Sequence, residues 1–245
     1  MNLNHVKQQI KRRVPLRLLW PVLRWLRQPD QPVNWRDLRR VTPISRVFGF
    51  DRGTPICRYY IAQFLQRHAQ NIRGRVLEVA DANYTRQFGG SRVTQSDVLH
   101  VTAGNANATI TGDFATGAGI PSEAFDCILL TQTLPFIYDI HAVVSHLHRA
   151  LRAGGIVLAT ASGISPISRY DMERWGDYWR LTDLSARTLF EEAFAPERIQ
   201  VETHGNVLAA VAYLFGLAAE ELTFAELDAQ DPDYQVIIAI RAEKS

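Results

Sequence analysis

From residue 74 onward, short apolar runs alternate with stretches of helical periodicity. Seven runs are rich in Val, Ile and Leu, and Gly, Asp, Asn or Ser residues separate most of them, which is typical of buried β-strands. We expect strands over residues 75–80, 97–101, 108–114, 125–132, 154–161, 198–205 and 234–243.

Helical patterns lie between these runs. Helices are expected over 54–70, where Thr54 can serve as the cap, over the segment DIHAVVSHLHRALRAGG, and around 206–222. Strands that alternate with helices indicate a parallel sheet with helices on both faces. The pattern therefore predicts an α/β, doubly wound, mostly parallel seven-stranded sheet, whose last strand inserts antiparallel at the end of the sheet, preceded by an N-terminal helical extension.

The 245 residues suffice for one sizeable domain with a helical extension. The proline-rich segment PDQPVNW at 29–35 is typical of a linker or turn. We expect a basic N-terminal arm over 1–32 and a domain over 33–245. Within that domain, 33–73 would be an N-terminal cover and 74–245 the core.

Charge is distributed unevenly along the chain. The formal net charge is +2, from 27 basic and 25 acidic residues. Residues 1–29 contain seven cations and no acid, so the remainder has 20 basic and 25 acidic residues, or −5. We therefore expect no nucleic acid binding by the body of the protein. The arm is too short and too charged to span a membrane; either it lies on an anionic membrane or a partner, or it packs on its own domain.

Cysteine usage favours a reducing compartment. Cys57 and Cys127 are the two cysteines, and Cys127 lies in the apolar run FDCILL. No metal-ligand spacing is present, so we predict buried free thiols, no metal site and a cytoplasmic protein.

Polar residues lie at the ends of the first four predicted strands. In an open parallel sheet, ligands bind outside the carboxyl ends of the strands. Glu78 lies on the first strand, and Asp97 follows 19 positions later, close to the spacing of an acid that binds ribose hydroxyls. Asp113 and Phe114 close the third strand, and Thr131 and Gln132 close the fourth. Four such strand ends together indicate a nucleotide-like ligand more specifically than any one alone.

Several phrases, in order, resemble the class I S-adenosylmethionine-dependent methyltransferases: VLEVADANY, GDF, IPSEAFDCILLTQTLPFIYD and LRAGGIVLAT. The later RWGDYWRLTDLSARTLFEE resembles a block in methyltransferases found beside polysaccharide biosynthesis enzymes. The resemblance implies a Rossmann-like fold and S-adenosyl-L-methionine as cofactor. It also implies these cofactor-binding residues: Glu78, Val79, Ala80, Asp97, Val98, Asp113, Phe114, Thr131 and Gln132.

The chain departs from the family at the turn after the first strand. Ala80, Ala82 and Tyr84 stand where glycine is ordinary, because glycine lets a ligand approach the backbone and permits positive φ. Alanine adds one methyl group, so Ala80 and Ala82 let a methionine chain pass near the backbone if φ stays negative, and we expect a cofactor site that is present but reshaped. Tyr84 is expected to turn away from the cofactor.

The methyl acceptor is expected over the same strand ends. Asp139 and His141 are the catalytic candidates, with His141 as a base whose pKa suits neutral pH; alternatively, His141 is only an exposed residue of a helix. Either the segment 48–60 folds over the cofactor, with Arg52 or Tyr60 near its carboxylate, or it is only a structural N-terminal cover. The segment 169–180 provides the predicted substrate-binding residues, unless it is a packed lid without substrate contact: Tyr170, Arg174, Trp175 and Trp179.

Three functions follow from these patterns. The first is O-methylation of a glycan, glycolipid or related small molecule by an S-adenosylmethionine-dependent methyltransferase. The second is a methyltransferase-like subunit without catalysis, suggested by the missing glycines. The third is a nicotinamide oxidoreductase, which the absence of G-x-G-x-x-G after the first strand disfavours.

Overall fold

The computed structural model describes residues 36–245, which form two units, one ending at Val41 and one comprising Thr42–Ser245. In the first unit, the described residues form the short helix η1 (Arg36–Arg39). The expected basic arm over 1–32 lies outside the described residues. No helix in the described part of the chain is long and apolar enough to cross a membrane.

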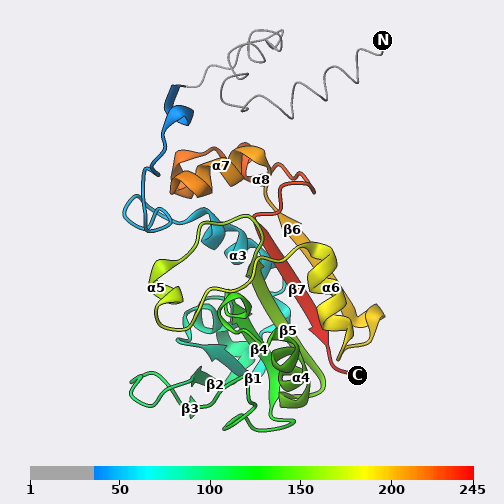
Figure 1. The fold of residues 1–245 in the computed structure, drawn as a ribbon. Coiled ribbons are helices and arrows are strands. Elements are labelled where there is room, and N and C mark those ends of the chain that lie inside the picture. Colours follow the sequence, from blue (N-terminus) through cyan, green and yellow to red (C-terminus); the bar gives the residue numbers. More distant parts are fainter. Residues whose placement is uncertain (1–35) are drawn as a thin grey trace, which may run out of the picture. The chain divides into compact units, whose positions relative to one another are not determined.

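The second unit is built on a seven-stranded sheet with the order β3-β2-β1-β4-β5-β7-β6. Strands β1 to β5 run parallel to one another, as the alternation of strands and helices predicts. Figure 1 shows the sheet in the middle of this unit. The strands are β1 (Gly74–Val79), β2 (Val93–His100), β3 (Ile110–Thr111), β4 (Phe125–Thr131), β5 (Leu151–Ser162), β6 (Ile199–His204) and β7 (Ile237–Glu243).

The last strand is antiparallel, as expected, but its place in the sheet differs from the prediction. Strand β7 pairs antiparallel with both β5 and β6, so it lies inside the sheet and β6 forms the edge. Strands pair with its backbone on both sides, and core clusters cover its side chains on both faces, so Ile237–Ile240 is continuously buried.

The two faces of the sheet bury alternate residues of the same strands. On one face, Ile128 and Leu130 of β4 belong to a core cluster with residues of α4 and α6. On the other face, Cys127 and Leu129 pack in a cluster with α3. Burial on both faces explains why the strands are continuously apolar, and it confirms the doubly wound architecture.

Six α-helices accompany the sheet in the part of the chain that the structure describes. In Figure 1, α4 and α6 lie beside β5 and β7, and α7 and α8 lie beyond the end of β6. Helix α3 begins after Pro55 without a side-chain cap, because Thr54 instead donates to Glu220. The helices are α3 (Ile56–Arg67), α4 (Ile140–Ala150), α5 (Arg169–Met172), α6 (Asp183–Glu191), α7 (Val207–Phe215) and α8 (Phe224–Asp228).

Candidate functional site

A cavity of about 1290 Å³ opens at the carboxyl ends of the parallel strands. Ligand pockets typically measure roughly 300–1,000 Å³, so this one has room for a cofactor and an acceptor together. Residues at or just after the ends of β1 to β5 line it, as expected for an open parallel sheet. They include Val79, Ala80, His100, Asp113, Thr131, Gln132 and Ser162.

Glu78, near the end of β1, organises the turn that follows. Its side chain is buried, and its two carboxylate oxygens accept hydrogen bonds from the backbone N–H groups of Tyr84 and Thr85, at 3.1 and 2.7 Å. Burial raises the pKa of this carboxyl group, and the backbone donors oppose that shift. Glu78 therefore holds the glycine-poor turn in place and also lines the cavity.

Ala80 adopts the conformation that glycine normally provides. Its φ is +73°, so the condition of a negative φ is not met. The Ala80 N–H donates to the Leu99 carbonyl at 3.0 Å, and its own carbonyl accepts from Asn105 at 3.0 Å, and these two bonds hold the turn in place. A left-handed conformation costs a non-glycine residue roughly 1–2 kcal/mol. Gln132 and Phe48 also have positive φ and line the cavity, so strained backbone gathers there.

Tyr84 does not turn away from the site. It lines the cavity, and its hydroxyl accepts a hydrogen bond from Arg58 at 2.9 Å. Its ring also stacks with Phe88, with 6.1 Å between ring centroids. The residue that replaces a glycine therefore forms part of the cavity wall.

Asp97 and Val98 lie outside the cavity, contrary to their predicted role. Asp97 pairs with Leu77 in the middle of β2, and the strand continues to His100. The Asp97 carboxylate accepts from Arg75 at 2.7 Å and from the Thr109 hydroxyl at 2.9 Å, and the backbone N–H of Val98 donates to Thr109. These bonds tie β1, β2 and the approach to β3 together, so Asp97 is a structural residue here.

The substitution Asp97→Ala should lower the free energy of unfolding by about 2 kcal/mol, because it removes a charge-assisted hydrogen bond and leaves Arg75 without this partner. Urea unfolding measures this loss. Glu191→Ala, which breaks an exposed pair with Arg187, is the control and should cost at most about 0.5 kcal/mol. If Asp97→Ala kept full stability but lost affinity for S-adenosylhomocysteine, the result would support a cofactor-binding role for Asp97 instead of a structural one.

His100 occupies the carboxyl end of β2, where the sequence suggested an acid. Its Nδ1 lies 3.0 Å from the carbonyl oxygen of Thr102, and its ring meets the ring of Trp175 edge-on at 5.8 Å. Asp113 and Phe114 line the cavity beside it. The Asp113 carboxylate accepts from the Ala115 N–H at 2.7 Å, and Phe114 is buried in the core.

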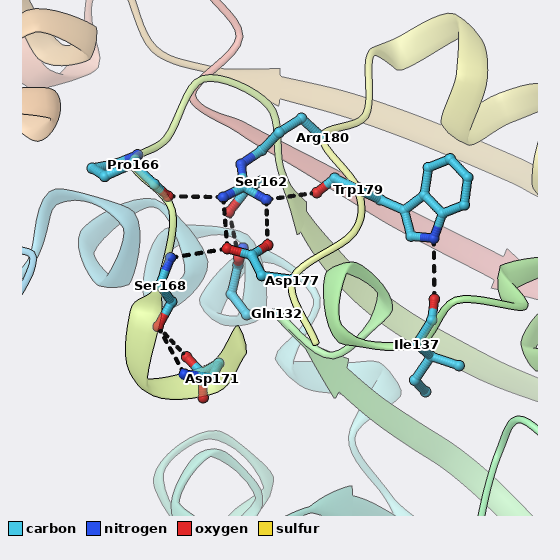
Figure 2. A network of polar contacts seen from close by, with 9 residues as sticks. All are labelled: Gln132, Ile137, Ser162, Pro166, Ser168, Asp171, Asp177, Trp179 and Arg180. Atoms are coloured by element: carbon cyan, nitrogen blue, oxygen red, sulfur yellow. Dashed lines mark hydrogen bonds and ion pairs between the residues drawn. The ribbon is translucent and has the colours of Figure 1, made fainter. Parts of the chain in front are cut away.

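Gln132 and Ser165 leave polar atoms unsatisfied at the cavity. The Gln132 Oε1 accepts from the Ser162 hydroxyl at 2.7 Å, as Figure 2 shows. Its Nε2 and the Ser165 hydroxyl are buried and have no hydrogen-bond partner in the protein. Buried polar groups are normally satisfied, and both residues line the cavity, so a bound ligand with acceptor atoms is the available partner.

The segment between β5 and α6 closes over the cavity and is fixed by Arg180. Its guanidinium makes two bonds to Asp177, at 2.5 and 3.0 Å, and also donates to the carbonyls of Pro166 and Trp179. Asp177 accepts from the Ser168 N–H as well (Figure 2). Burial alone would raise the pKa of Asp177, but the bonds from Arg180 and Ser168 outweigh it and lower the pKa. This network makes the segment a defined wall.

Three of the four predicted substrate-binding residues line the cavity: Tyr170, Arg174 and Trp175. Arg174 stacks over the Tyr170 ring at 3.6 Å. Trp179 is absent from the lining, since its indole N–H donates to the carbonyls of Ile137 and Tyr138, and its ring packs on the core.

The structure adds Tyr138 and Tyr178, whose rings meet edge-on at 5.4 Å in the cavity wall. The aromatic phrases FIYD and DYWR were the sequence signal for them.

The two catalytic candidates lie away from the cavity lining. Asp139 is the N-cap of α4, and its carboxylate accepts from the Ala142 N–H. His141 is exposed on the first turn of α4 and pairs with Glu192 at 2.8 Å. The chain lines the cavity through Tyr138, and the start of α4 then carries Asp139 and His141 away from it. The position of His141 matches the alternative interpretation, that it is an exposed residue of a helix.

Arg58 of α3 is the cation that the sequence did not single out. It lines the cavity, and its one side-chain partner is the Tyr84 hydroxyl; no carboxylate of the described residues forms an ion pair with it. The two expected residues are elsewhere, because Arg52 pairs with Glu221 and the buried Tyr60 hydroxyl donates to Leu227. Arg58 is thus a partly buried cation that lacks an anion.

Comparison with known protein families identifies the domain. Residues 71–159, which span β1 to most of β5, match the family model described as a methyltransferase domain. The chain carries a methyltransferase domain. This match and the sheet order agree with the resemblance of the sequence to the class I S-adenosylmethionine-dependent methyltransferases. No curated protein matches the chain.

Solved structures show the same fold as this methyltransferase domain. The N-methyltransferase NodS from Bradyrhizobium japonicum, in complex with S-adenosyl-L-homocysteine, has a TM-score of 0.51 at 14% identity, covering 86% of this chain and 97% of NodS. The [4+2]-cyclase SpnF has a TM-score of 0.51 at 16% identity, covering 79% and 84%. An Archaeoglobus fulgidus methyltransferase has a TM-score of 0.50 at 11% identity, covering 76% and 94%. Because these similar structures include a cyclase, the reaction must be argued from the site.

Proposed function

We propose that the cavity binds S-adenosylmethionine along the ends of β1 to β4 and that the domain methylates an oxygen of a glycan, a glycolipid or a related small molecule. The convergence of unsatisfied donors on one large cavity carries the proposal. The cavity lacks acceptor atoms for three donors. Arg58 has no carboxylate partner among the described residues, and the Gln132 amide and the Ser165 hydroxyl have no hydrogen-bond partner in the protein. A ligand with a carboxylate and ribose hydroxyls offers such atoms, so the residues fit this cofactor.

The cofactor supplies a methyl group on a positively charged sulfur. In this proposal Arg58 binds the methionine carboxylate, the open backbone at Ala80 leaves room for the methionine chain, and His100 and Phe114 lie beside the nucleoside. The protein then acts by holding the acceptor in line with the methyl group and by excluding water, which contributes a large share of the rate in such transfers.

The acceptor would occupy the aromatic part of the cavity. Tyr138, Tyr170, Trp175 and Tyr178 line that part, with Arg174 stacked on Tyr170. Aromatic faces beside hydrogen-bonding groups suit the apolar faces and hydroxyls of sugars. This arrangement supports a hydroxylated acceptor.

A second function is a methyltransferase-like subunit that binds without catalysis. Two observations favour it. Ala80 has a positive φ that is unfavourable for any residue except glycine, and the ionisable pair predicted for catalysis, Asp139 and His141, lies outside the cavity lining. Under this alternative the cavity binds a ligand or nothing, and no methyl group is transferred.

Calorimetric titration with S-adenosylmethionine, S-adenosylhomocysteine and NAD, followed by transfer of labelled methyl groups to a panel of glycans and glycolipids, separates these functions. We expect binding of the first two ligands, no binding of NAD, and label in a hydroxylated acceptor. Binding without transfer to any acceptor would favour the non-catalytic subunit. Failure of both adenosyl ligands to bind would contradict the cofactor assignment.

We also propose a reducing compartment such as the cytoplasm for this protein. Cys57 and Cys127 are both buried and unpaired. Burial raises the pKa of each thiol, which keeps it in the unreactive protonated form.

A further inference from the structure

Exposed apolar side chains gather around the cavity. Among the described residues, nine of the fifteen large apolar side chains that are exposed also line the cavity. They belong to segments far apart in sequence, such as Val47 and Phe50 before α3, Ile167 and Tyr170 near α5, and Leu214 of α7. Figure 1 shows α5 and the segment before α3 on the same side of the sheet. Concentrated exposed apolar surface marks an interaction site rather than ordinary surface.

The exposed charges of this cavity rim have one sign. Arg46, Arg169 and Arg174 line the cavity and are exposed. The described acidic residues that line it, such as Asp113 and Asp177, are all buried or half-buried. The rim therefore presents cations and apolar groups to its surroundings, although the chain outside residues 1–29 has a net charge of −5.

The rim is anchored to the fold and is continuous with an apolar helix face. The backbone N–H groups of Ile44 and Ser45 both donate to the Phe215 carbonyl at the end of α7. Val207 and Leu214 are both exposed and lie two turns apart on one face of α7. The segment that contains Ile44 and Ser45 follows, along the chain, residues 1–29, which contain seven cations and no acid.

We propose that the cavity rim, defined by Arg46, Val47, Phe50, Ile167, Arg174 and Leu214, docks on an anionic lipid surface with the cavity facing the membrane. The apolar side chains enter the interface, and the arginines meet lipid phosphates. Charge distinguishes this occupant from a second copy, because a second cationic rim would repel the first. The inference concerns an interface and does not depend on methyl transfer.

Vesicle flotation of the full chain tests this interface. The vesicles contain phosphatidylcholine alone or with phosphatidylserine, at low and high salt. We expect flotation with the anionic vesicles that weakens as salt rises. The double variant Phe50→Ser with Leu214→Ser should lower the bound fraction at least about tenfold, because each apolar side chain contributes to insertion. Leu184→Ser, an exposed residue of α6 away from the cavity, is the matched control and should float like the original protein.

Thermal melting of each variant establishes that it is folded, and size-exclusion chromatography without vesicles reports the oligomeric state. No flotation of the full chain with anionic vesicles would overturn the proposal. Equal flotation of the double variant and the original protein would assign any membrane binding to residues outside the rim. A change from dimer to monomer in the double variant would make the rim an interface between copies instead.

Discussion

The substitution Ala80→Leu should abolish binding of S-adenosylhomocysteine without unfolding the protein. Ala80 lines the cavity with φ of +73°, so its Cβ already carries the backbone cost that leucine would carry. The added carbons instead fill the space that the methionine chain needs. We expect affinity to fall by at least about a hundredfold, since overlap of this kind excludes the ligand rather than weakening one contact. Calorimetric titration measures the loss, and thermal melting checks the fold.

Ala80→Gly is the matched control for this experiment. It removes the strain, and after allowing for the greater freedom of glycine in the unfolded chain it should raise the free energy of unfolding by about 0.5–1 kcal/mol. Binding should be kept or improved. If Ala80→Leu bound the ligand normally, the turn after β1 would not be a cofactor loop, and the family resemblance would extend to the fold alone.

The order of strands and helices could be predicted from the sequence because the sheet is buried on both of its faces. Residues such as Cys127 and Ile128 are buried on opposite faces of the sheet, and this requires continuous apolar runs that a reader of the sequence can find. The end of β2 could not be found in this way. The first half of that strand, around Thr94 and Gln95, is exposed and polar, so the apolar run marks only its second half. The sequence pattern therefore predicts Asp97 at a strand end, although it lies in the middle of β2.

The candidate site was predictable where it follows the sheet and not where it depends on side-chain direction. Glu78, Asp113 and Gln132 line the cavity because strand ends are fixed by the topology. Which face of a helix meets the cavity depends on packing. Arg58 faces the cavity, whereas Tyr60, two residues later, is buried against α8. Spacing along α3 does not distinguish these two outcomes before the helix is docked.

The substitution Arg58→Met should weaken binding of S-adenosylhomocysteine roughly 10- to 150-fold, the equivalent of a charge-assisted hydrogen bond worth about 1.5–3 kcal/mol. Arg58 is half-buried, and no carboxylate of the described residues forms an ion pair with it, so the ligand carboxylate is its expected counter-ion. Methionine keeps the length and packing of the arginine stem while it removes the charge. Calorimetric titration gives both affinities.

A second ligand and a second variant make this test specific to the carboxylate. Methylthioadenosine contains the nucleoside and the sulfur but lacks the amino acid end, so Arg58→Met should bind it as well as the original protein does. Tyr84→Phe removes the one hydroxyl that Arg58 contacts and leaves the guanidinium, so its affinity for S-adenosylhomocysteine should change by only a few fold. Equal losses for both ligands in Arg58→Met would mean that the substitution disturbs the cavity as a whole. Unchanged affinity for S-adenosylhomocysteine would mean that Arg58 meets a different anion, such as one carried by the acceptor.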